Sequence, residues 1–229
     1  MTDRRFLARN LVTTADGSHT IYLPAVGEHY HSSFGALRES RHVFLEQGYD
    51  VAAACARDRL RVLEIGLGTG LNALLTWDRA RHNLAPVAYT ALEPFPVTEE
   101  LACQLNYPDQ LAARAARQAF AALHRCRWGV IEPLGEYFSL LKLGITVEDF
   151  QPSGEYDLVY YDTFSPAVQP EVWTRRVFEK VFGCMSAGSL LVTYCAQGEV
   201  RRNLRSVGFA LERLAGPPGK REMTRARKP

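Results

Sequence analysis

The chain has 229 residues, of which 47% are hydrophobic, 10% aromatic and 23% charged, and its formal net charge is +2. This composition is typical of one folded domain, with or without a small extension, and excludes disordered, collagen-like and low-complexity proteins. No stretch approaches eighteen uninterrupted apolar residues, so we expect no transmembrane helix.

Apolar runs of strand length alternate with helical patterns, an order that is typical of a parallel α/β sheet. The first fifty residues predict an appended segment with a turn at 16–18, a strand over 20–23 and a helix over 35–47. The strands predicted after it cover 60–65, 87–92, 139–144, 156–161, 189–194, 209–214 and 221–226. The helices predicted between them cover 71–81, 97–105, 110–126, 173–185 and 198–207. The last two strands flank a Gly-Pro-Pro-Gly turn and predict a hairpin that closes the sheet.

The cysteines and the first residues indicate a cellular compartment. Five scattered cysteines form no C-x-x-C pair, which is typical of a reducing compartment and argues against a structural zinc site. Residues 1–6 carry charges but no following apolar core, so we expect no signal peptide. We therefore predict a cytoplasmic protein that contacts no membrane and binds no metal.

The net charge conceals an asymmetry along the chain. From residue 199 to the C-terminus, nine lysines and arginines stand against three acids, so the preceding part is net acidic. A basic end on an acidic body can bind a polyanion. A solvated helix face followed by a frayed terminus is the alternative interpretation.

The sharpest motif is the segment 64–72, EIGLGTGLN, where an acidic strand end precedes three alternating glycines and a helix start. Glycine lets the backbone approach a ligand closely, and a helix N-terminus offers free N–H donors. A dinucleotide loop requires the spacing G-x-G-x-x-G. The spacing of Gly66, Gly68 and Gly70 instead resembles the S-adenosylmethionine loop of class I methyltransferases. A strand-to-helix turn without a ligand is the alternative.

Two further acids end predicted strands. Glu93 lies 23 residues after Gly70, where a carboxylate can accept hydrogen bonds from ribose hydroxyls. Asp162 begins the segment 162–166, DTFSP, which resembles the loop by which many amino-group methyltransferases hold the nitrogen that they alkylate. A carboxylate there can orient an amine and accept its proton. Capping of the following helix is the alternative for both acids.

These motifs stand in an order that resembles a known family. The chain is similar to the methyltransferase domain of the bifunctional proteins of tRNA 5-methylaminomethyl-2-thiouridine biosynthesis, from about residue 16 to residue 226. The segments that carry the resemblance are 14–20, 30–40, 43–44, 66–72, 162–166, 170–173, 193–194, 200–202 and 220–223.

The resemblance implies a class I methyltransferase fold with S-adenosyl-L-methionine as cofactor. Residues 56–229 would form a Rossmann-like, mostly parallel seven-stranded sheet with a C-terminal antiparallel hairpin, and residues 1–55 an extension packing on the cofactor site. Glu39 and the glycine loop would hold the methionine end, Glu93 the ribose and Asp149 the adenine. The cofactor-binding residues implied are Glu39, Glu64, Gly66, Gly68, Gly70, Asn72, Glu93 and Asp149.

The resemblance also implies a substrate. The chain would bind the anticodon region of tRNA and methylate the primary amine of 5-aminomethyluridine at the wobble position, giving 5-methylaminomethyluridine. Asp162 would be the catalytic residue and would face this amine. The residues implied to contact the substrate are Tyr30, Phe164, Pro166, Arg201, Arg202, Lys220 and Arg221.

Several features depart from the family pattern or leave alternatives open. Leu67 stands where the family commonly has an aromatic residue, and Ser165 where it has alanine. The flavin-dependent oxidase half of the bifunctional proteins does not follow before Pro229, so we expect another enzyme to supply the aminomethyl group. An amine methyltransferase acting on a protein or small molecule, and a non-catalytic tRNA-binding module, remain as alternatives. The oligomeric state is left open.

Overall fold

The predicted apolar runs assemble into one central sheet of eight strands. The computed structural model describes residues 8–56, 58–152 and 154–229, and the stretch 1–6 that we used to predict the lack of a signal peptide lies outside these ranges. The strands are β4 (Leu60–Ile65), β5 (Val87–Leu92), β6 (Ile131–Pro133), β7 (Phe138–Leu143), β8 (Tyr156–Tyr161), β9 (Met185–Thr193), β10 (Ala210–Ala215) and β11 (Glu222–Arg227).

The strand order is β10-β11-β9-β8-β4-β5-β7-β6. The strands β7, β5, β4, β8 and β9 are parallel to one another, whereas β11 runs antiparallel to both β9 and β10. This arrangement confirms the predicted class I methyltransferase fold with its closing hairpin. The expected count of seven strands was too low, because β6 adds an antiparallel edge strand beside β7. The three residues of β6 are not buried and include a proline, so the sequence shows no apolar run that predicts this strand.

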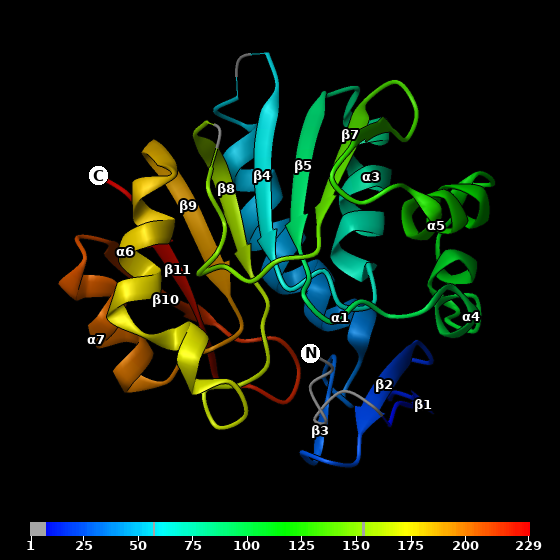
Figure 1. Ribbon diagram of the computed structural model, residues 1–229, viewed down its shortest axis with the longest axis horizontal. Coiled ribbons are helices and arrows are strands. Elements are labelled where there is room, and N and C mark those ends of the chain that lie inside the picture. The colour runs from blue at the N-terminus through cyan, green and yellow to red at the C-terminus, as the bar shows by residue number, and fades with distance from the viewer. Residues whose placement is uncertain (1–7, 57, 153) are drawn as a thin grey trace.

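Helices cover both faces of the sheet. They are α1 (Ala36–Ser40), the π-helical η2 (Arg41–Tyr49), α2 (Asp50–Ala53), α3 (Leu71–Asn83), α4 (Glu99–Ala102), the 3₁₀-helical η3 (Tyr107–Gln110), α5 (Ala116–Arg125), the 3₁₀-helical η4 (Pro170–Trp173), α6 (Arg175–Gly183) and α7 (Gly198–Ser206). Figure 1 shows α6 and α7 beside β8–β11, and α3 and α5 beside β7. The helices predicted over 97–105 and 110–126 are shorter in the structure, and β9 begins four residues before the strand predicted over 189–194.

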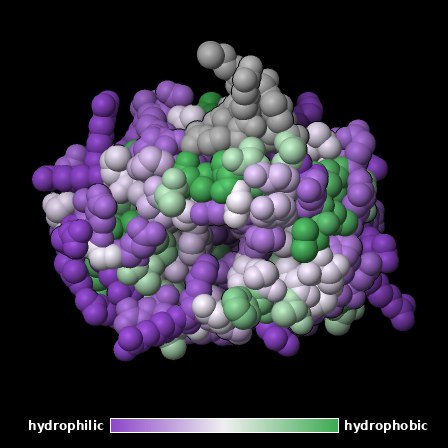
Figure 2. All heavy atoms as spheres, turned by 90° about the horizontal axis from the view of Figure 1, so that it is seen from below, coloured by the Kyte–Doolittle hydropathy of each residue, from purple (hydrophilic) through white to green (hydrophobic). Residues whose placement is uncertain are grey.

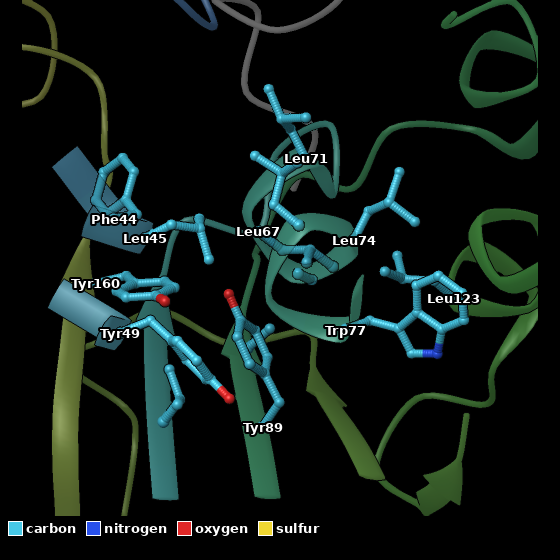
Figure 3. Packing of buried hydrophobic residues seen from close by; sticks show 14 of the residues in the cluster. Phe44, Leu45, Tyr49, Leu67, Leu71, Leu74, Trp77, Tyr89, Leu123 and Tyr160 are labelled. Carbon is cyan, nitrogen blue, oxygen red and sulfur yellow. The ribbon is translucent and has the colours of Figure 1, made fainter. Parts of the chain in front are cut away.

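Alternating strand residues separate two hydrophobic cores. One core joins strand residues such as Val62 and Tyr160 to η2 and α3, and the other joins strand residues such as Leu63 and Tyr161 to α6 and α7. Figure 3 shows the first core, in which Phe44 and Tyr49 from η2 pack near Tyr160. Residues before position 55 therefore contribute to the main core, and the predicted boundary at 55 stays a prediction.

A small antiparallel sheet precedes α1. It consists of β1 (Asn10–Thr13), β2 (His19–Leu23) and β3 (Glu28–His29), of which the sequence predicted only β2. In Figure 1 this sheet lies below the main sheet, at the edge where β4 and β5 end. The Arg9 guanidinium joins the two parts by donating hydrogen bonds to the carbonyl oxygens of Phe95 and Pro96, at 2.6 and 2.8 Å.

The sheet order places the strand ends that matter at one point. From β4 the chain continues to β5, which pairs with one side of β4, whereas β8 pairs with the other side of β4. Loops diverge at such a point, and open α/β sheets bind ligands in the resulting crevice at the carboxyl ends of the strands. Gly66 follows β4, Glu93 follows β5 and Asp162 follows β8. The fold therefore brings together three predicted site residues that are far apart in sequence. Among the described residues, no helix is long and apolar enough to cross a membrane.

Candidate active site

The glycine loop after β4 needs glycine for two different reasons. Gly66, Gly68 and Gly70 have φ angles of +94°, +51° and +76°, a region that other residues rarely adopt. A Cβ on Gly66 would lie 2.5 Å from the backbone oxygen of Asp162, and one on Gly68 would lie 3.1 Å from Cδ1 of Tyr30. The loop therefore lies directly against the β8 loop and against Tyr30, and a side chain at either glycine would close this approach.

Glu93 fixes the glycine loop from the end of β5. Its carboxylate accepts hydrogen bonds from the backbone N–H groups of Gly68 and Phe95, both at 2.8 Å. Burial raises the pKa of Glu93, and these two hydrogen bonds oppose the rise. Capping of the following helix is overturned as an interpretation, because Thr98 caps α4.

Asp162 is held at the end of β8 by a buried polar chain. The Asn72 side-chain amide donates to Oδ2 of Asp162 at 2.8 Å and to Oε1 of Glu64 at 3.0 Å. Burial and the nearby Glu39 carboxylate raise the pKa of Asp162 to about 7, while the Asn72 hydrogen bond and the Lys220 charge act against the rise. Asp162 does not cap a helix, since the next helical element, η4, begins at Pro170. A carboxyl group with this pKa can exchange a proton near neutral pH.

An ion pair between the N-terminal segment and the C-terminal hairpin lies beside Asp162. Nζ of Lys220 is 2.6 Å from Oε1 of Glu39 and 3.8 Å from the centroid of the Tyr194 ring. The second Glu39 oxygen accepts the backbone N–H of Ser32 at 2.8 Å. Lys220 therefore lies at the site beside Asp162 and not on a separate basic surface, and its predicted contact with the substrate stays a prediction.

These groups line a cavity of about 530 Å³, a size typical of small-ligand sites. Figure 2 views the molecule from this edge and shows a hollow near its centre. The charged residues among the described residues that line it are Glu28, Glu39, Glu93, Glu148, Asp162, Glu171 and Lys220. Six acids against one lysine favour a cationic ligand. S-adenosylmethionine, with a sulfonium and an ammonium against one carboxylate, fits this charge.

Comparisons with known proteins agree with this geometry. Residues 140–229 match a family model described as S-adenosyl-L-methionine-dependent methyltransferase. The tRNA 5-methylaminomethyl-2-thiouridine biosynthesis bifunctional protein MnmC of Azoarcus is 32% identical over 219 residues, which are 91% of this chain and 34% of the relative. The protein of the same name from Paracidovorax citrulli is 34% identical over 224 residues, with 90% and 34% covered.

A solved structure extends the similarity to the whole fold. The crystal structure of MNMC2 from Aquifex aeolicus matches with a TM-score of 0.75 at 26% identity, covering 97% of this chain and 71% of that one. The chain belongs to the S-adenosylmethionine-dependent methyltransferases. Its cofactor is S-adenosylmethionine. It spans about a third of the length of the curated relatives that it matches.

Some predicted cofactor residues of the methyltransferase lie outside the cavity lining. Glu64 and Asn72 are buried beneath Asp162 and support it, and Gly70 caps α3. Asp149 is exposed and its carboxylate accepts the Thr146 hydroxyl at 3.1 Å. The preceding residue, Glu148, lines the cavity and Asp149 does not, so the adenine contact predicted for Asp149 has no support from the cavity lining and stays a prediction.

The residues predicted to contact the substrate also divide into those that line the cavity and those that do not. Tyr30 and Phe164 both line the cavity and pack edge to face, with ring centroids 5.0 Å apart, whereas Pro166 is absent from the lining. Arg202 and Arg221 are exposed, as a contact with tRNA requires.

The structure corrects the role predicted for Arg201. Its side chain is 6% exposed, and its guanidinium donates to Oε2 of Glu222 at 2.6 Å, the Thr224 hydroxyl at 3.0 Å and the Met223 carbonyl at 2.9 Å. All three nitrogens are used to join α7 to β11. Arg201 is therefore a structural residue, and its predicted contact with tRNA was wrong.

Sequence reasoning missed several lining residues of the methyltransferase. Glu28 lies in β3 of the small sheet, and its carboxylate accepts a hydrogen bond from the hydroxyl group of Ser165, a residue that departs from the family pattern. Tyr194 donates its hydroxyl to the Thr163 carbonyl at 2.8 Å and thereby holds the Asp162 loop. Phe34 is exposed at the cavity rim. Tyr194 could have been found, because it ends a predicted strand at the ligand-binding edge, but Glu28 and Phe34 carry no such signal.

Proposed function

We propose that the chain methylates the primary amine of 5-aminomethyluridine at the wobble position of tRNA, giving 5-methylaminomethyluridine. The observation that carries the proposal is Asp162, a half-buried carboxyl group with a pKa of about 7 in an acidic cavity at the switch point of the sheet. The names of the relatives, which denote tRNA 5-methylaminomethyl-2-thiouridine biosynthesis, support tRNA as the substrate.

The cofactor would be held by groups from three strand ends. In this proposal Glu93 accepts hydrogen bonds from ribose hydroxyls through the carboxylate lone pairs that Gly68 and Phe95 leave free. Glu39 lines the same cavity and would receive the ammonium group of the methionine end. The bound cofactor supplies a methyl group activated by its sulfonium.

Asp162 would prepare and orient the acceptor. A primary amine near neutral pH is mostly protonated, with lysine at about 10.4 as a guide, and the protonated form has no lone pair. The Asp162 carboxylate would take one proton from the ammonium, and the freed lone pair could then attack the methyl group that the bound sulfonium supplies, with S-adenosylhomocysteine as the leaving group. The methylated amine would keep its remaining proton or release it to water, and Asp162 would return its own proton to water before the next turnover. The remaining catalysis comes from holding nitrogen, carbon and sulfur in line.

The tRNA would be held outside the acidic cavity. Arg202 on α7 and Arg221 on the β10–β11 turn are exposed and belong to the basic C-terminal part of the chain. Arginine contacts to phosphates give affinity without reading sequence. The anticodon loop would thus be positioned by arginines while its modified base enters a cavity that favours cations.

The proposal is tested by incubating the protein with S-adenosylmethionine and a synthetic anticodon stem-loop RNA that contains 5-aminomethyluridine. Nucleoside mass spectrometry should show a gain of one methyl group on that nucleoside. An otherwise identical RNA with unmodified uridine is the control and should gain none. Cofactor binding without any methyl transfer to this RNA would contradict the proposed acceptor.

A further inference from the structure

Phe34 is an exposed aromatic residue at the mouth of the cavity. Its side chain is 56% exposed, although phenylalanine is usually buried. The described residues include six other exposed large hydrophobic residues, but Phe34 alone among the seven lines the cavity. An exposed ring at a binding cavity indicates a surface that becomes covered when the ligand binds.

The backbone on both sides of Phe34 is fixed. The Ser33 carbonyl accepts the N–H of Ala15 at 2.9 Å, and the Gly35 N–H donates to the Ser32 carbonyl at 3.1 Å. Gly35 has a φ of +139°, and a Cβ there would lie 2.4 Å from Oδ2 of Asp16. The exposed ring therefore stands on an ordered turn, which lowers the entropic cost of binding to it.

The C-terminal hairpin supports the ring from below. A Cβ on Gly219 would lie 2.3 to 2.7 Å from three ring atoms of Phe34, so the ring packs directly on this glycine. The next residue, Lys220, forms the ion pair with Glu39. One apolar contact and one ion pair thus join the hairpin turn to the segment that carries Phe34.

We infer that Phe34 is a stacking platform for the pyrimidine ring that carries the acceptor amine. This inference rests on the proposed function and assigns a specificity-determining residue to the same site. Proteins read single-stranded RNA loops by stacking unpaired bases on aromatic side chains. With the ring of the substrate on Phe34 at the rim, its aminomethyl group would extend inward toward Asp162, which lines the same cavity. Tyr30 and Phe164 pack on each other and would form the inner wall.

The test measures methyl transfer to the 5-aminomethyluridine stem-loop by Phe34→Leu and Phe34→Tyr. Leucine keeps apolar volume but cannot stack, so we expect KM for the RNA to rise roughly 5- to 50-fold. Its kcat and its affinity for S-adenosylmethionine should stay within about threefold of the wild type, because Phe34 touches neither the amine nor the cofactor-binding carboxylates. Tyrosine can stack and should restore KM to within about threefold.

Trp128→Leu is the matched control. Trp128 is also an exposed aromatic, at 39%, but it is absent from the cavity lining, so its KM should not change. An unchanged KM in Phe34→Leu would overturn the inference, as would equal impairment of the Leu and Tyr variants. A parallel loss of cofactor affinity would overturn it in favour of a structural role. A wild-type protein that binds the cofactor but does not methylate the RNA would contradict the proposed function itself, and the inference with it.

Discussion

The cavity at the carboxyl ends of the strands and the arginine-rich C-terminal part differ in how their charges are used. The cavity gathers six acids from distant parts of the chain around one lysine. The C-terminal part keeps Arg202, Arg205 and Arg221 exposed but turns Arg201, a neighbour in sequence, into the interior. The acids of the cavity come together through the strand order, whereas the three arginines of α7 are divided by which side of the helix they occupy.

This difference teaches that charge in a sequence predicts a function only after the fold has placed it. The basic tail suggested four groups for tRNA, yet Arg201 and Lys220 hold the hairpin to the rest of the protein. The net acidic charge of residues 1–198 did not predict a cavity that suits a cation. Four changes test whether the two regions are as different as the contacts indicate.

The largest effect is expected from Asp162→Asn. Asparagine keeps an oxygen but loses the basicity that takes up the amine proton, so turnover at neutral pH should fall on the order of 10²-fold or more. Affinity for S-adenosylmethionine, measured by isothermal titration, should change by only a few-fold. Asp149→Asn, an exposed acid outside the cavity, is the control and should keep normal turnover. Near-normal turnover of Asp162→Asn would remove Asp162 from the mechanism.

Arg201→Gln should destabilise the protein. The substitution leaves the buried Met223 carbonyl and Thr224 hydroxyl without their donor, and each such loss costs about 1–3 kcal/mol. Urea unfolding should show the lower midpoint. Arg202→Gln, one residue along and exposed, should stay within about 0.5 kcal/mol of the wild type. Equal stability of the two variants would contradict the structural role of Arg201.

Gly68→Val should weaken cofactor binding by more than about tenfold. A side chain there would meet Tyr30 and would require an unfavourable φ, so the loop would have to move away from Glu93. Isothermal titration with S-adenosylmethionine measures the loss, and circular dichroism checks that the fold persists. Gly183→Val is the control, since an added Cβ meets nothing within 4 Å there. Retained affinity in Gly68→Val would show that the loop is only a turn.

The smallest effect is expected from replacing Arg202, Arg205 and Arg221 together by glutamine. If these exposed arginines contact phosphates, tRNA affinity should fall several-fold and its dependence on salt should become shallower. Cofactor affinity should not change, because none of the three lines the cavity. An unaltered dependence of tRNA affinity on salt would show that the three arginines are solvated surface residues that do not contact phosphates.

The sequence predicted the parts of this protein that follow from local patterns. Strands such as β4 and β8 were placed correctly, because short runs dominated by apolar residues mark buried strands. The glycine loop could be found because positive φ angles restrict the residue type. Edge strands β1, β3 and β6 were missed, since their residues are exposed or half-buried and carry no such pattern.

The parts that were missed depend on long-range contacts. Nothing local shows that Lys220 meets Glu39, because the two are 181 positions apart in the chain. The sequence singled out Asp149, whereas the structure places its neighbour Glu148 in the cavity lining, because the sequence does not reveal which of two adjacent exposed acids a loop brings to the cavity. Glu28 likewise reaches the site only because the small sheet folds under the β8 loop and meets Ser165.

The pH dependence of single-turnover methyl transfer tests most directly whether Asp162 accepts the amine proton. Burial raises the pKa of Asp162 to about 7, so its carboxylate is lost as the pH falls below this value. The pKa of His31, the buried histidine of the cavity, is lowered to about 4 and stays clear of this range. The wild-type rate should therefore rise with pH and show an inflection near pH 7. The positive charge of the bound cofactor favours the carboxylate and would move this inflection to a lower pH. In Asp162→Asn this inflection should vanish, and the rate should recover only at the higher pH where free amine forms. An Asp162→Asn profile with the wild-type inflection and wild-type rates would contradict the account.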